Sequence, residues 1–142
     1  MNAKLGTGYR VLVVGCEKAL VRYFSVFLKI FGYKVDTALS VGEAFRKAQA
    51  HPPNILIVMV LMPEMSGVDV GLRICRQSHC SVLFVAAMDI QNFDHMLEQL
   101  RGEGRVCAGL PLPFENSDLL AKLKALSSGY GFRRKDLRLR SP

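Results

Sequence analysis

The stretch from Asn54 to Gly67, NILIVMVLMPEMSG, decides how this chain folds. Eight apolar residues run from Ile55 to Met62, and Pro63 ends the run. A short run of this kind, rich in β-branched residues, is typical of a strand buried on both faces inside a parallel sheet. Because parallel strands need a crossover connection, the flanking sequence should alternate between strand-like and helix-like segments.

The rest of the chain shows that alternation. Strand-like segments cover residues 10–15, 33–38, 55–62, 81–87 and 105–108, and helical patterns cover 18–31, 40–50, 67–77, 89–100 and 115–127. Ser40 and Glu43 have capping-box spacing, Asp89 is a candidate cap for the fourth helix, and Gly32 stands where a helix C-cap glycine belongs. Five β-α units in sequence predict an α/β fold with a doubly wound, five-stranded parallel sheet.

Apolar side chains recur at helical spacing in four of the five predicted helices, and these stripes should face the sheet. The residues expected inside are Leu20, Phe24, Phe27, Leu28 and Phe31; Val68, Leu72 and Cys75; Phe93, Met96, Leu97 and Leu100; and Leu119, Leu120, Leu123 and Leu126.

Length and composition indicate one globular domain. The chain has 142 residues, half of them hydrophobic, and a net charge of +7. Residues 130–142 hold five bases against one acid, a net +4, so the remainder carries only +3. We therefore expect an N-terminal arm over 1–8, one domain over 9–128 and a basic tail over 129–142. A mildly basic domain gives little reason to expect a folded surface built for nucleic acid.

The sequence also predicts a location. No apolar stretch approaches the roughly 18 residues of a membrane span, and no secretion signal is evident at the N-terminus. The four cysteines have no framework-like spacing. We therefore expect reduced thiols in a cytoplasmic protein without a membrane partner.

The M-P-x-M-x-G loop at 62–67 and the Pro113-Phe114 pair resemble the receiver domain of response regulators, over roughly residues 9–127. The resemblance implies a flavodoxin-like, CheY-like fold with strand order 2-1-3-4-5. It also implies a self-phosphorylation site built by an acidic pair, an acceptor aspartate, a hydroxyl and a lysine. The acids hold magnesium, the aspartate is the nucleophile, and the hydroxyl and lysine stabilise phosphoryl charge.

Carrying these positions over one by one retains none of that chemistry. The acidic pair falls on Gly15 and Cys16, the acceptor on Met59, the hydroxyl on Ala86, the lysine on Leu112, and the aromatic associated with phosphorylation on Gly109. A thioether cannot be phosphorylated and is a poor magnesium ligand. The resemblance thus predicts a degenerate pseudo-receiver that is not an enzyme and has no catalytic residue, cofactor or metal.

Such a protein would act by contact in a two-component signalling pathway. The resemblance implies a partner or homodimer face made by the fourth helix, the fifth strand and the fifth helix. Its candidate residues are Gln91, Asp94, His95, Glu98, Asp118 and Lys122. Polar outward residues of this kind are equally typical of a solvated surface.

Three other readings of the sequence remain open. Flavodoxins share the topology, but their phosphate-cradling loop is rich in Ser, Thr and Gly, unlike 15–19 here. The chain could instead be cut from a larger regulator, with a tail that contacts nucleic acid. Alternatively, Arg134 and Arg138 have the R-x-x-x-R spacing of a PilZ-type cyclic-dinucleotide motif.

The cysteines offer two further candidate sites. Cys75, His79 and Cys80 would need a fourth ligand and better spacing to hold a metal. Cys16 could be a reactive thiol beside a helix N-terminus, or simply a small semi-buried residue.

Overall fold

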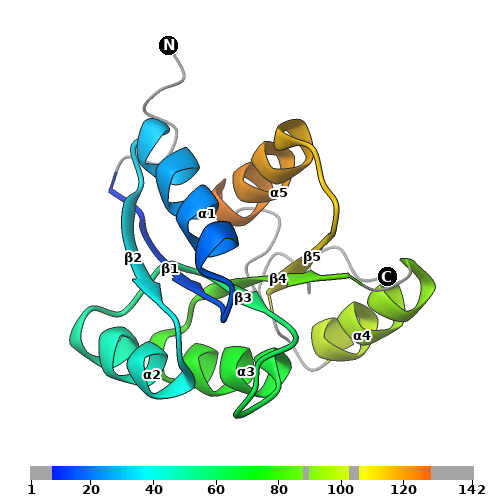
Figure 1. Ribbon diagram of the computed structural model, residues 1–142. Helices are drawn as coiled ribbons and strands as arrows, with labels where there is room; N and C mark the ends of the chain where they lie inside the picture. Colours follow the sequence, from blue (N-terminus) through cyan, green and yellow to red (C-terminus); the bar gives the residue numbers. More distant parts are fainter. Residues whose placement is uncertain (1–7, 88–89, 103–105, 129–142) are drawn as a thin grey trace.

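In a computed structural model of the chain, the strands form one parallel sheet in the order β2-β1-β3-β4-β5 (Figure 1). The structure describes residues 8–87, 90–102 and 106–128. The elements are β1 (Arg10–Val14), α1 (Lys18–Ile30), β2 (Lys34–Ala38), α2 (Val41–Ala50), β3 (Ile55–Met59), α3 (Gly67–Ser78), β4 (Ser81–Ala86), α4 (Ile90–Gly102), β5 (Cys107–Pro111) and α5 (Asn116–Ser128). This order and alternation confirm the predicted CheY-like fold.

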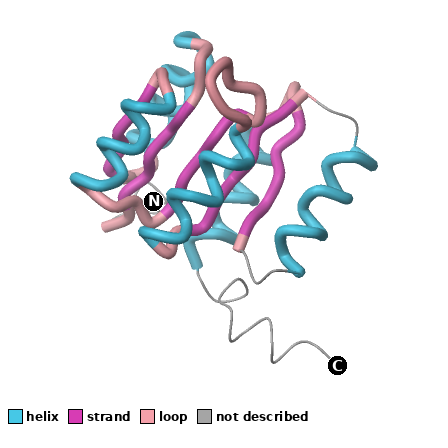
Figure 2. The backbone as a smooth tube through the Cα atoms, turned by 90° about the horizontal axis from the view of Figure 1, so that it is seen from below, coloured by secondary structure: helices cyan, strands magenta, loops and turns pink. Residues whose placement is uncertain are grey.

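The helices cover the sheet in two layers. Figure 1 shows α1 and α5 on one face and α2, α3 and α4 on the other, and Figure 2 shows the strands running side by side between them. Two apolar clusters correspond to these layers, one beneath α1 and α5 and one beneath the other three helices. All five residues of β3 are buried, as the apolar run predicts.

Local signals in the sequence explain where two helices begin and end. The Ser40 hydroxyl accepts the Glu43 N–H at 3.2 Å, and the Glu43 carboxylate accepts the Leu39 N–H at 2.9 Å. This is a capping box whose reciprocal bond reaches one residue further back than usual. Gly32 has φ +90° immediately after α1, which confirms the predicted C-cap glycine.

Two strand bounds differ from the sequence prediction. β5 runs from Cys107 to Pro111 rather than over 105–108, because its register with β4 extends to the pair Ala86 and Pro111. The strand includes Gly109 and Pro111, and an edge strand tolerates both residue types. β3 ends at Met59, before the apolar run does, because the Val60 carbonyl accepts the Gly67 N–H across the following loop.

Two helical faces are rotated from the predicted ones. In α3 the buried residues include Val70 and Ile74, whereas Val68 and Leu72 are only partly buried. The cause is a pair of glycines that face the sheet: a Cβ at Gly71 would lie 3.0 Å from the Phe84 ring, so this side of the helix approaches closely. In α1, Val21 is buried together with Phe24 and Leu28, whereas the predicted Leu20 is only partly buried.

The remaining differences are smaller. Like Leu20, the side chains of Phe27, Phe31, Met96 and Leu120 are partly buried rather than fully so, and the other predicted stripe residues of α1, α4 and α5 are buried. The predicted cap Asp89 lies outside the described residues.

β5 is an edge strand of the sheet, and Arg101 of α4 binds a backbone carbonyl on its outer side. The Val82 N–H binds the Val106 carbonyl, so alternate residues of β5, including Cys107, turn their backbone groups away from β4. The Arg101 guanidinium donates two hydrogen bonds to the Cys107 carbonyl, at 3.0 and 3.2 Å. The last residue on this side, Pro111, has no N–H to donate.

Candidate functional site

The ends of β1 and β3 bring Gly15 and Met59 together at the carboxyl edge of the sheet. Val14 pairs with Val58, so the residues that follow them are neighbours across adjacent strands. This edge is where doubly wound sheets place their ligands. Both residues are buried, with Met59 only 6% exposed.

The Met59 side chain occupies the space that a side chain at position 15 would need. A Cβ built on Gly15 would lie 2.6 Å from Met59 Cε and closer still to Sδ, well inside van der Waals contact. The glycine and the methionine therefore fit each other, and a carboxylate at position 15 would require Met59 to move. The sequence shows both substitutions but not this packing, because the residues are far apart in the chain.

The other two inner positions are also apolar. Ala86 is buried at the end of β4, and its carbonyl accepts the Leu112 N–H at 3.0 Å. Leu112 packs against the cluster beneath α1 and α5, next to Phe114. Neither side chain can offer a hydroxyl or an ammonium to a ligand at this edge.

Cys16 and Glu17 are exposed at the rim of this edge. The Cys16 thiol lies 3.8 Å from the Leu61 carbonyl, and Leu61 itself is 82% exposed. Across the described ranges, no three Asp, Glu, His or Cys side chains gather in a way that could hold a metal ion. Next to the apolar positions, this part of the rim thus carries the Glu17 carboxylate and the Cys16 thiol.

At Gly109, α4 fills the place of the expected aromatic side chain. A Cβ at this position would lie 2.7 Å from Phe93 Cε1 and 2.9 Å from Leu97 Cδ1. Two apolar side chains of α4 therefore rest directly on the β5 backbone. As with Gly15, the sequence shows the glycine but not the side chains that cover it.

The predicted partner residues all lie on α4 and α5. Gln91, Asp94, His95, Glu98 and Asp118 are exposed, and Lys122 is half-buried. Arg134 and Arg138 of the tail lie outside the described residues.

Sequence reasoning missed an exposed apolar stripe on α1. Tyr23, Val26 and Ile30 are 41%, 51% and 63% exposed, and they stand at helical spacing on the outer face. The Tyr23 hydroxyl donates to Asn116 Oδ1 at the start of α5, and its ring stacks on Phe27. The signal for this stripe was present, because the α1 sequence is apolar around most of the helix.

Comparison with known proteins identifies the family. The family model for the response regulator receiver domain matches residues 11–105. The chain belongs to this family. Receiver domains are signalling domains of two-component systems, in which they interact with other signalling proteins.

The proteins that this chain resembles include transcriptional regulators and a chemotaxis protein. The regulatory protein KdpE of Mycobacterium tuberculosis is 42% identical over 65 residues, 44% of this chain and 29% of that protein. The regulator PhoP of Bacillus subtilis is 26% identical over 117 residues, 82% of this chain and 48% of PhoP. The structure of Vibrio cholerae CheY4 superposes with a TM-score of 0.72 at 26% identity, covering 83% of this chain and 98% of CheY4.

The chain spans about half the length, or less, of the curated relatives it matches. Among the described residues, every helix is too short or too polar to cross a membrane.

Proposed function

We propose that this chain is a receiver domain that cannot be phosphorylated and that signals by non-covalent contact with other proteins. The observation that carries the proposal is the Met59 side chain, which stands at the acceptor position and fills the space above Gly15. In this reading the domain over 9–128 keeps the receiver fold and lacks the receiver switch.

Each step of the phosphorylation chemistry lacks a group at the site. A thioether has no nucleophilic oxygen to accept a phosphoryl group. Magnesium needs hard oxygen ligands, and Glu17 at the rim is a single exposed carboxylate. Leu112 supplies no positive charge for the phosphoryl oxygens. A lysine in this half-buried place, without the acids, would be an unpaired charge and therefore costly.

The direct test is exposure to a phosphoryl donor and to a phosphoryl mimic. We expect no mass increase after incubation with acetyl phosphate and magnesium, and no change in amide NMR peaks with beryllofluoride and magnesium. A receiver domain that retains its aspartate, treated in parallel, shows that the reagents are active. A phosphoryl adduct, or peak shifts around Met59, would contradict the proposal.

The contact surface is proposed to be the α4–β5–α5 face. Its support is family membership together with the exposed Asp94, His95 and Glu98 on α4. A specific observation favours a competing surface, because three of the exposed large apolar side chains lie on α1 instead.

One variant on each surface, a charge reversal on α4 and an introduced charge on α1, separates the two possibilities. Asp94→Lys with Glu98→Lys should abolish self-association or partner capture if α4 is the docking element. Val26→Asp with Ile30→Asp should do so if α1 is. Circular dichroism verifies that both variants fold, and loss of binding only in the α1 variant would reject the α4–β5–α5 proposal.

A second candidate is a receiver module of a longer regulator that contacts nucleic acid or a cyclic dinucleotide. The observation behind it is that the aligned residues make up only 29% and 48% of two relatives described as transcriptional regulatory proteins. The tail at 129–142, with its net +4 over 130–142, would be the contacting segment. Binding that weakens steeply with salt and vanishes after deletion of 130–142 would support it. Binding unchanged by that deletion would reject it.

A further inference from the structure

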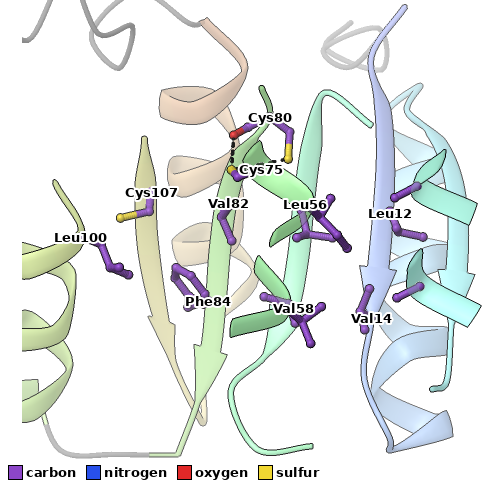
Figure 3. Close-up of a cluster of buried hydrophobic side chains, with 14 of the residues drawn as sticks. Leu12, Val14, Leu56, Val58, Cys75, Cys80, Val82, Phe84, Leu100 and Cys107 are labelled. Atoms are coloured by element: carbon purple, nitrogen blue, oxygen red, sulfur yellow. Dashed lines mark hydrogen bonds between the residues drawn. The ribbon is translucent and has the colours of Figure 1, made fainter. Parts of the chain in front are cut away.

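Two cysteine side chains meet at the end of the sheet opposite the candidate site. Cys75 lies in the last turn of α3, and Cys80 immediately precedes β4 (Figure 3). Between them His79 adopts the left-handed conformation, with φ 55° and ψ 40°, which ends the helix and turns the chain back. The two sulfur atoms are 3.7 Å apart, and the Cys75 thiol donates to the Cys80 carbonyl at 2.7 Å.

The surroundings of this pair are apolar. Cys75 and Cys80 are 7% and 5% exposed and belong to the cluster that includes Ile74 and Val82. The hydrogen bond between the two thiols, followed by burial, raises the pKa of Cys80. Both thiols are shielded from solvent, so their reaction with an oxidant is slow compared with that of an exposed thiol such as Cys16.

A third buried thiol, that of Cys107, belongs to the same apolar cluster. Cys107 lies on β5 opposite Val82, and burial raises its pKa to about 11. Its electrostatic interaction with Cys75 also raises that pKa, after burial, which has the largest effect. Across the described ranges these thiols do not form a group that could hold a metal ion.

We propose that Cys75 and Cys80 are a redox-active dithiol, which hydrogen peroxide converts into an intramolecular disulfide. One sulfur attacks a peroxide oxygen and the O–O bond breaks. That cysteine becomes a sulfenic acid, and one water is released. The second sulfur then displaces the sulfenic oxygen as a second water. The peroxide is reduced by two electrons, and both thiol protons leave in the waters.

A disulfide has a bond of about 2.05 Å, so the two sulfur atoms must come together from their present separation of 3.7 Å. The new bond replaces the hydrogen bond from Cys75 to the Cys80 carbonyl and ties the last turn of α3 to the start of β4. This inference does not depend on whether Met59 can be phosphorylated.

Peptide mapping of the full chain tests this proposal. The protein is reduced, freed of reductant, treated with hydrogen peroxide under native conditions and digested with trypsin without reduction. Cleavage after Arg73, Arg76 and Arg101 separates the two cysteines, so we expect peptide 74–76 joined to peptide 77–101 with the loss of two hydrogen atoms.

Four serine variants serve as controls. Cys75→Ser and Cys80→Ser should each abolish the linked peptide, whereas Cys16→Ser and Cys107→Ser should retain it. A link to Cys107, an intermolecular link through Cys16, or sulfinic acid without any link would overturn the proposal. So would a link that forms only in denaturant, because it would then belong to the unfolded chain. The wild-type map decides the question even if a variant fails to fold.

Discussion

Replacing Gly15 by alanine would measure how tightly Met59 fills the edge of the sheet. The added Cβ would lie 2.6 Å from Met59 Cε, where a relaxed carbon contact is about 3.5–4.0 Å. Overpacking a buried position costs about 1–3 kcal/mol, and we expect the lower part of that range because the opposing atoms end a flexible side chain. Gly15 does not have positive φ, so alanine also recovers about 0.4–1 kcal/mol from the unfolded chain. The net loss should be about 1 kcal/mol.

The same substitution should change sign when Met59 is already alanine. The overlap with Sδ and Cε is then absent, and only a milder approach to Val21 Cγ2, at 3.1 Å, remains. Gly15→Ala should now stabilise by up to about 0.4–1 kcal/mol. The coupling energy between the two positions is therefore expected to be about 1–2 kcal/mol, within the range found for residues in contact.

Urea unfolding followed by far-UV circular dichroism measures all four proteins of this cycle. Equal m-values are required, so that midpoints report free energies of unfolding. Gly42→Ala is the matched control, because its Cβ on α2 would meet only the Arg46 guanidinium, at 3.7 Å. It should stabilise by about 0.5–1 kcal/mol in both backgrounds. Additivity of Gly15→Ala and Met59→Ala within about 0.5 kcal/mol would refute the packing argument.

Three further outcomes are expected. Met59→Asp alone should remain unmodified by acetyl phosphate in intact-mass spectra, because the acidic pair, hydroxyl and lysine are still missing; a phosphoryl adduct would show that fewer groups suffice. Gly109→Ala should lower the free energy of unfolding by about 1–3 kcal/mol, since its Cβ would lie 2.7 Å from the Phe93 ring; an unchanged urea midpoint would count against that contact. The Leu39 N–H and Lys47 hold the pKa of Glu43 below its ordinary value. Its stabilising effect is therefore full above the unfolded pKa of about 4.3 and is lost as the pH falls through the folded value. Glu43→Gln should flatten the pH dependence of the urea midpoint in that acidic range, and an equally steep fall in the variant would exclude this role.

The sequence was sufficient for the elements whose signals are local. The apolar run before Pro63 predicted β3, and the spacing of Ser40 and Glu43 predicted the start of α2. These signals work because burial on both faces and capping leave their marks on adjacent residues. The parallel sheet then followed from the alternation of strands and helices.

The details that the sequence did not predict all depend on contacts between distant residues. The bounds of β5 depend on its pairing with β4, and the inner face of α3 depends on how Gly71 meets the Phe84 ring. At the candidate site, residue types alone predicted the missing chemistry, but the fit of Met59 over Gly15 was visible only in three dimensions. Cys75 and Cys80 had been considered only as metal ligands, because the left-handed turn at His79 could not be foreseen.

The arginine along β5 has a consequence for the behaviour of the protein at high concentration. An unprotected edge strand is a template on which another chain can add a strand and begin to aggregate. Here the Cys107 carbonyl is already bound by Arg101, and Pro111 has no donor to offer. An incoming strand would therefore lack one backbone hydrogen bond at Cys107 and another at Pro111, the two ends of this short edge. We therefore expect β5 to resist strand addition, and Arg101→Ala to make the protein more prone to fibril formation.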